Sequence, residues 1–185
     1  MPAVSIEKVN SKLLNFNTLD KKTELNRVIF GSKKYNRFIN EFWTAKQRQA
    51  NNLHEISYRA CYKPQLPKFF IDLLTKKGDV VYDPFAGRGT TLIEAALLNR
   101  NIISNDINPL SHILTESRLN IPTIKQIGER LDQIHFKESK ADIDLSMFYH
   151  KDTESEIVCL KNNLDTSNFV DNWIKMVSTT RLTGH

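Results

Sequence analysis

Residues 83–91 read Asp-Pro-Phe-Ala-Gly-Arg-Gly-Thr-Thr. A short apolar run, Val80-Val81-Tyr82, precedes them, and a helical pattern follows from Leu92 to Leu98. This order of strand, glycine turn and helix is the one in which α/β proteins bind nucleotide-like cofactors. Gly87 and Gly89 lack a Cβ atom, so the turn can be tight and a ligand can approach the backbone closely.

The segments around this turn predict a parallel βαβ unit. We expect a helix that begins at residue 67 and is ended by Gly78, further helices from 90 to 99 and from 109 to 119, and strands at 79–84 and 101–106. Thr91 and Glu94 have the spacing of a capping box, which predicts where the middle helix begins. Further helices are expected near 123–135, 153–164 and 167–178. Alternating strands and helices predict an α/β fold with a Rossmann-like start and parallel strands.

The acidic residues around the turn indicate the kind of cofactor. Asp83 ends the first strand, and Asp106 ends the second strand 17 residues after Gly89, where a carboxylate can accept hydrogen bonds from both ribose hydroxyls. A dinucleotide site needs a third glycine, but Leu92 stands there, and no Gly-Lys-Ser/Thr of a P-loop occurs. Asp83 suits a positively charged ammonium group better than a pyrophosphate. These residues favour S-adenosylmethionine, and a purely structural turn is the alternative.

Three motifs in order resemble those of the DNA amino-methyltransferases, which modify adenine N6 or cytosine N4. Residues 83–95 resemble motif I, Tyr62-Lys63-Pro64-Gln65-Leu66-Pro67 resembles motif X, and Asn105-Asp106-Ile107-Asn108-Pro109 resembles motif II. The resemblance covers residues 54 to 120 and implies a Rossmann-like methyltransferase fold.

The resemblance also implies which residues contact the cofactor. Carried over by position, these are Asp83, Pro84, Phe85, Ala86, Gly87, Gly89, Thr90, Thr91, Asp106, Ile107, Pro64 and Leu66. In that family pattern Asp83 and Gly87 contact the methionine part, Asp106 holds the ribose, and Ile107 flanks the adenine. Pro64 and Leu66 approach from the motif X side.

The chain departs from the family pattern at the catalytic motif. That motif is Asp/Asn/Ser-Pro-Pro-Tyr/Phe, and it holds the flipped target base, but this chain contains no Pro-Pro. No catalytic residue can therefore be named. We expect a fold that is incomplete at the C-terminus and inactive alone, with the motif in a missing C-terminal region or a second chain. The five histidines have no metal-ligand spacing, and methyl transfer to an amino group requires no metal.

The charge of the chain is concentrated before the cofactor motif. Residues 1–63 hold 12 Lys and Arg against 5 Asp and Glu, a net charge of +7, while the remainder is −2. We expect residues 1–55 to form a basic helical segment, broken near Gly31-Ser32, and residues 56–185 to form the first part of the methyltransferase domain. The bases expected to contact DNA are Lys33, Lys34, Arg37, Lys46 and Arg48. The alternative is a solvated surface on an amphipathic helix that docks Phe38, Ile39, Phe42 and Trp43 against the domain.

Composition excludes other classes of protein. An apolar content of 40% and a charged content of 25% are those of a globular domain. The chain has no membrane-length apolar run, signal peptide or CxxC pair, so we expect a cytoplasmic, reduced protein. Two alternatives to a DNA methyltransferase remain open. One is an RNA methyltransferase, which uses the same cofactor, and the other is a non-catalytic subunit that presents cofactor or DNA to a partner.

Overall fold

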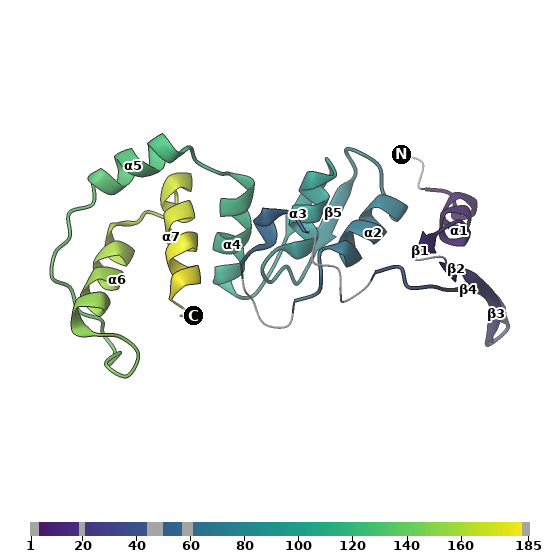
Figure 1. Ribbon diagram of the computed structural model, residues 1–185, viewed down its shortest axis with the longest axis horizontal. Coiled ribbons are helices and arrows are strands. Elements are labelled where there is room, and N and C mark those ends of the chain that lie inside the picture. Colours follow the sequence, from purple (N-terminus) through teal and green to yellow (C-terminus); the bar gives the residue numbers. More distant parts are fainter. Residues whose placement is uncertain (1–3, 19–20, 44–49, 57–60, 183–185) are drawn as a thin grey trace. The chain divides into compact units, whose positions relative to one another are not determined.

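The structure is a computed structural model that describes residues 4–18, 21–43, 50–56 and 61–182. The chain divides into two compact units, Met1–Ile107 and Asn108–His185. The architecture mixes helices and strands, as expected for the α/β class (Figure 1). The division expected after residue 55 stays a prediction. Among the described residues no helix has the length and apolar character needed to cross a bilayer.

The first unit holds all the strands among the described residues. Its elements, in chain order, are α1 (Ile6–Leu14), β1 (Asn17–Thr18), β2 (Lys21–Lys22), β3 (Glu24–Phe30), β4 (Lys33–Ile39), the short 3-10 helix η1 (Asn52–His54), α2 (Gln65–Leu74), β5 (Val80–Asp83), α3 (Thr90–Leu97) and β6 (Asn101–Ser104).

The core of the first unit is a βαβ unit. Strands β5 and β6 pair in parallel, with Val80 opposite Asn101 and Asp83 opposite Ser104. Helix α3 packs against both strands, and α2 packs against α3. Leu92 and Ile93 of α3 have no solvent exposure, because the helix buries this apolar side against the sheet. The parallel pairing predicted from the sequence is therefore confirmed.

The local signals that end and begin these elements only partly match the expectations. Gly78, expected to end α2, instead precedes β5 with a φ of 84°, and α2 ends at Leu74. The expected capping box at the start of α3 is wrong. Gly89 is the N-cap, with a φ of 79° and no side-chain cap, because Glu94 is buried against a distant residue described below.

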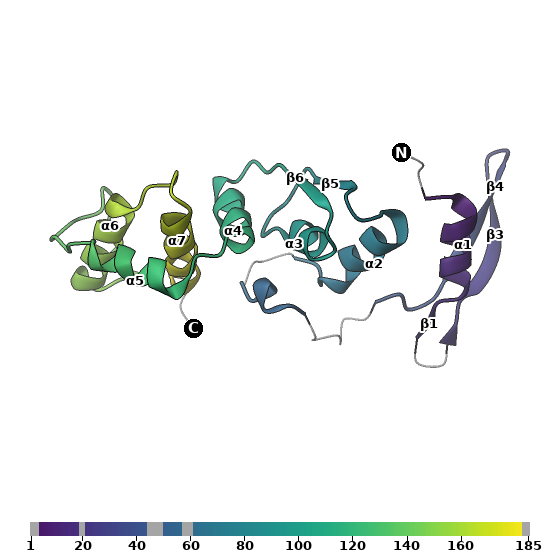
Figure 2. The ribbon, with the colours of Figure 1, turned by 90° about the horizontal axis from the view of Figure 1, so that it is seen from above.

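The basic segment before the core is not the expected helix. Residues 24–39 form an antiparallel hairpin in which β3 and β4 are joined by Gly31-Ser32 (Figure 2). Gly31 has a φ of 60° at the first of the two central turn positions, which matches the right-handed twist of the strands. The helical expectation was wrong because strand-forming residues flank this turn, and the turn reverses the chain instead of interrupting a helix.

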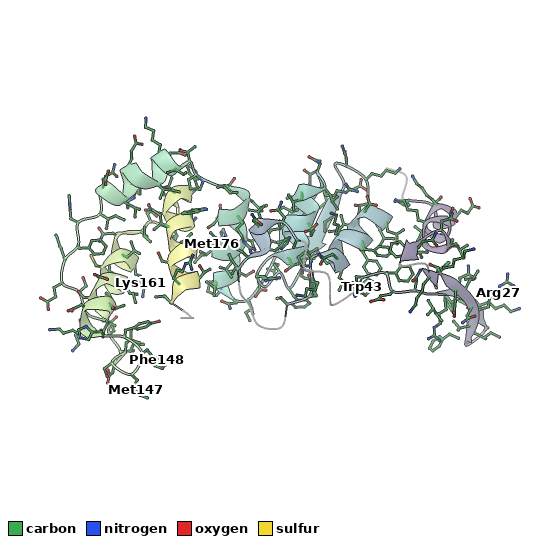
Figure 3. All side chains as sticks on the ribbon, in the orientation of Figure 1. Arg27, Trp43, Met147, Phe148, Lys161 and Met176 are labelled. Atoms are coloured by element: carbon green, nitrogen blue, oxygen red, sulfur yellow. The ribbon has the colours of Figure 1, made fainter. Side chains whose placement is uncertain are left out.

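The residues that were expected to share one helix face therefore lie differently. Phe38 and Ile39 belong to β4, whereas Phe42 and Trp43 follow it. The ring of Phe42 lies 5.2 Å from that of Phe69, and Trp43 lies 5.6 Å from Phe70 (Figure 3 labels Trp43). The aromatic residues still anchor this segment, but they do so on α2 and from the base of a hairpin.

The second unit is helical throughout its described elements. These are α4 (Pro109–Leu119), α5 (Ile124–Asp132), α6 (Lys151–Asn163) and α7 (Phe169–Arg181).

Helix α7 packs against α4 and α5. Asp171 of α7 is buried and receives two hydrogen bonds from Arg130 of α5, at 2.7 and 3.0 Å. Burial alone raises the pKa of Asp171, but the hydrogen bonds from Arg130 and the Asp165 amide outweigh it, and the pKa is lowered.

Candidate cofactor site

The glycine turn joins the end of β5 to α3 and is hydrogen-bonded to the residue that follows β6. The amide of Asn105 donates to the carbonyl of Asp83 at 3.0 Å, and the amide of Ala86 donates to the carbonyl of Asn105 at 3.1 Å. The turn closes on itself through a hydrogen bond of 2.7 Å from the Gly89 amide to the Ala86 carbonyl. Gly87 and Gly89 both have positive φ, 54° and 79°, a conformation that residues with a Cβ rarely adopt. The backbone of the turn is thus fixed by both strands.

Two carboxylates hold this backbone from the two strand ends. Oδ1 of Asp83 accepts a hydrogen bond of 3.0 Å from the Phe85 amide. Oδ2 of Asp106 accepts one of 2.7 Å from the Gly87 amide. Asp83 is buried and Asp106 is partly exposed. The structure therefore brings together Asp83, Gly87 and Asp106, which the sequence analysis had predicted to share one site.

The apolar side chains beside the turn lie open to solvent. Phe85 is 85% exposed and Ile107 is fully exposed. Thr90, by contrast, is buried, and its Oγ1 accepts a hydrogen bond of 3.1 Å from Nε of Arg88. The carbonyl of Pro84 accepts one from the Asn105 side chain at 3.3 Å. Of these four residues, Phe85 and Ile107 offer surface to a ligand, while Thr90 and Pro84 support the loop.

Tyr62, in the stretch that resembles motif X, contacts the site although it was not among the predicted cofactor-binding residues. Its hydroxyl makes a short hydrogen bond with Oγ1 of Thr91 and a long contact of 3.5 Å with Oδ2 of Asp83. Burial is the main reason why the pKa of Tyr62 is raised, and the nearby Asp83 carboxylate adds to this. Its place in the stretch that resembles motif X was the signal that could have found it.

Pro64 and Leu66 have a less direct place at the site. Pro64 is buried and serves as the N-cap of α2, and the amide of Leu66 donates to the carbonyl of Lys63 at 3.1 Å. The segment that contains them reaches the site through Tyr62. Their contact with a cofactor stays a prediction.

A buried polar pair supports the helix that follows the turn. Nε2 of His54 lies 2.8 Å from Oε1 of Glu94, and both side chains are almost fully buried. Arg88 donates from Nη1 to the carbonyl of Ile56 at 2.7 Å. The segment around η1 is thereby attached to both the turn and α3. No sequence pattern predicts this pair, because its members are 40 residues apart.

The basic residues that were expected to contact DNA lie in two parts of the chain. Lys33, Lys34 and Arg37 lie on the exposed hairpin strand β4. Lys46 and Arg48 lie outside the described residues. Among the side chains that the structure describes, no group of three or more His, Cys, Asp or Glu residues could hold a metal ion.

Comparison with known proteins places this geometry in context. The chain is 45% identical over 65 residues to the Type II methyltransferase M.HindIII of Haemophilus influenzae, and 24% identical over 155 residues to the Type II methyltransferase M.MvaI of Kocuria varians. It is 36% identical over 63 residues to a tRNA (guanine(10)-N2)-dimethyltransferase of Methanocaldococcus jannaschii. These matches cover 35%, 82% and 34% of this chain. They cover 21%, 31% and 18% of the relatives, so the chain spans less than a third of each.

No solved structure matches the chain. The sequence model of the N6/N4 methyltransferase family, described as DNA methylase, matches residues 6–115, which is more than half of the chain. That interval includes the glycine turn and both carboxylates around it. The chain belongs to the N6/N4 DNA methylase family.

Proposed function

We propose that this chain is the cofactor-binding portion of a DNA methyltransferase. The enzyme would transfer a methyl group from S-adenosylmethionine to an exocyclic amino group of adenine or cytosine. The observation that carries the proposal is the arrangement of Asp83 and Asp106 around a glycine turn at the ends of two parallel strands. Ligands of open α/β sheets bind at such strand ends.

The chemistry of these residues fits S-adenosylmethionine. This cofactor carries a positively charged sulfonium and an ammonium group, and it supplies an activated methyl group when bound. Two carboxylates favour that charge, whereas they would repel a pyrophosphate. The residues of the turn itself are fixed by hydrogen bonds before any ligand arrives, which lowers the entropic cost of binding.

Each residue has a distinct role in this proposal. Asp106 accepts hydrogen bonds from the ribose hydroxyls while it keeps the Gly87 amide in place. The exposed side chains of Phe85 and Ile107 cover the apolar parts of the cofactor. Asp83, with Tyr62 beside it, faces the ammonium group. Gly87 and Gly89 allow the ligand to lie against the backbone.

The methyl acceptor has to be positioned by residues outside the glycine turn. The chain contains no Pro-Pro, so we infer that the aromatic motif which holds the target base belongs to polypeptide outside these 185 residues. That polypeptide would be a further region or a second chain, and it would complete a Rossmann-like sheet around β5 and β6. Holding the two reactants in line would then provide much of the rate.

A methyl-transfer assay tests the proposed function. The chain is combined with its completing polypeptide, identified from the continuing reading frame or the adjacent one, and with labelled S-adenosylmethionine. We expect label in adenine or cytosine of duplex DNA from the combination and none from the chain alone. Label in DNA from the isolated chain would refute the inference that the base-holding motif lies in other polypeptide. Absence of label with both the chain and the combination would refute the proposed methyl transfer.

A tRNA-modifying relative supports a second candidate, an RNA methyltransferase. Its shared segment does not distinguish the substrates, because both enzyme classes use one cofactor. Adding structured RNA in place of DNA to the same assay separates them. The motif X resemblance at Tyr62–Pro67 and the match to the DNA methylase family favour DNA.

A further inference from the structure

The hairpin formed by β3 and β4 is exposed on both faces. The two strands have seven residues each, and only Phe38 among them is partly buried. Ile29 and Phe30, next to the turn, are 71% and 82% exposed. A two-stranded ribbon is marginally stable alone, so a ribbon this open needs an anchor or a partner.

The anchor lies at the base of the hairpin. The Asn40 side chain donates to the carbonyl of Phe16 at 3.0 Å and to Oγ1 of Thr23 at 2.9 Å. Phe16 and Phe42 then pack on Phe69 of α2, with ring centroids 5.3 and 5.2 Å away. The base is therefore fixed to the helix that precedes β5, and the rest of the ribbon is presented to solvent.

The ribbon is positively charged. Residues 24–39 contain four cations, Arg27, Lys33, Lys34 and Arg37, against the single carboxylate of Glu24. Glu24 lies at the base, opposite Ile39, while Lys33 and Lys34 lie beside the turn. Both faces carry two cations, since paired residues of antiparallel strands point to the same side. A polyanion is the partner that this charge distribution fits.

The cross-strand pairs place side chains that can bind base edges on both faces of the ribbon. Arg27 lies opposite Asn36 on one face, and Asn26 lies opposite Arg37 on the other. Arginine and asparagine are the side chains that bind guanine and adenine edges with two hydrogen bonds each. The major groove of B-form DNA is wide enough for a two-stranded ribbon, whereas the deep groove of A-form RNA is not.

We propose that the β3–β4 ribbon enters the major groove of duplex DNA and reads bases there. The face of Arg27 and Asn36 is turned toward the base edges, because it carries no carboxylate, whereas the opposite face carries Glu24. Lys33 and Lys34 contact phosphates beside the groove. Arg27 lies on the ribbon far from Trp43 at the base (Figure 3). This inference rests on the proposed function only in that the substrate is DNA.

The two faces provide a matched pair of variants. Arg27→Ala with Asn36→Ala changes the proposed reading face, and Arg37→Ala with Asn26→Ala removes the same residue types, the same charge and the same kind of cross-strand pair from the other face. The full chain and both variants select duplexes from a randomised DNA pool, which is then sequenced. Affinity for the selected duplex and for a scrambled one is measured at several salt concentrations.

We expect the full chain to enrich a short sequence. The Arg27/Asn36 variant should lose part of it and bind the selected duplex about 10-fold more weakly or worse, with a small change on scrambled DNA. The Arg37/Asn26 variant should keep the sequence. Both should change the slope of log affinity against log salt by less than one, because both keep Lys33 and Lys34, which make the proposed phosphate contacts.

Several results would overturn the proposal. Equal losses on both duplexes for both variants would show that the ribbon provides charge alone. Loss of the selected sequence only in the Arg37/Asn26 variant would refute the assigned face. No selection by the full chain, or equal affinity for structured RNA, would refute base reading. Calorimetric titration of the same samples with S-adenosylmethionine separates these failures from failure of the proposed function, because the ribbon variants leave the glycine turn intact.

Discussion

Removal of the Asp106 carboxylate is the sharpest perturbation of the candidate site. Asp106→Ala deletes the acceptor that holds the Gly87 amide at 2.7 Å and, in our proposal, the acceptor for the ribose. A hydrogen bond to a charged group contributes about 1.5–3 kcal/mol. Losing this energy from the bond to the ribose corresponds to an affinity for the cofactor that is about 10- to 150-fold lower. The loss of the Gly87 contact should also reduce the free energy of unfolding by about 1 kcal/mol, because this carboxylate is only partly buried.

Asp79→Ala is the matched control for this variant. Oδ2 of Asp79 also accepts one backbone hydrogen bond, from the Lys76 amide at 2.8 Å, but Asp79 precedes β5 at its opposite end. Calorimetric titration with S-adenosylmethionine measures affinity, and thermal unfolding measures stability. We expect both variants to lose stability and only Asp106→Ala to lose affinity. Equal affinity of Asp106→Ala and the unaltered chain, or equal losses in both variants, would refute the ribose assignment.

Four further outcomes follow from contacts in the structure. Tyr62→Phe should weaken cofactor binding by about 1 kcal/mol, since it removes the hydroxyl that contacts Thr91, and unchanged titration curves would contradict this. The pKa of Tyr62 is raised in the folded chain, so the neutral phenol contributes to the free energy of unfolding up to about pH 10, and this contribution is lost as the pH rises further. Denaturant titrations of Tyr62→Phe should therefore show a smaller loss of stability at alkaline pH than those of the unaltered chain. Asp171→Asn should lower the free energy of unfolding by about 3 kcal/mol at neutral pH, because it leaves Arg130 poorly paired. The control Glu129→Gln, at an exposed ion pair, should lower it by under about 0.5 kcal/mol. Equal urea midpoints for the two variants would disprove this difference. The pKa of Asp171 is lowered, so its contribution is present above about pH 4 and is lost as pH falls through the lowered value, a loss that Asp171→Asn should lack.

The elements that local chemistry determines were predictable from the sequence. The bounds of α4 match the expected helix 109–119, because Pro109 suits the first turn and the Asn108 side chain caps the helix by accepting a hydrogen bond from the Leu110 amide. The glycine turn and both carboxylates were found because each stands at a strand end, and strand ends of a parallel pair meet at one edge.

Two of the failures come from contacts with residues distant in sequence, and the third comes from a residue pattern that fits two structures. Glu94 had capping-box spacing, but burial beside His54 gives it another partner. The hairpin was misread because its aromatic residues also fit a helical period, although the strand-forming residues on both sides of Gly31-Ser32 favour β3 and β4. Tyr62 was missed as a site residue because its partners Thr91 and Asp83 are 29 and 21 residues away.

The most direct test of the cofactor site follows backbone amides by heteronuclear NMR. The full chain is titrated with S-adenosylmethionine up to about 1 mM, a concentration that covers the usual range of substrate affinities. We predict that the amide signals of Gly87, Gly89 and Ile107 move most and saturate together, while those of the β3–β4 hairpin stay in place. A folded sample in which the Gly87 and Gly89 signals do not move, or move no more than those of the hairpin, would contradict the account.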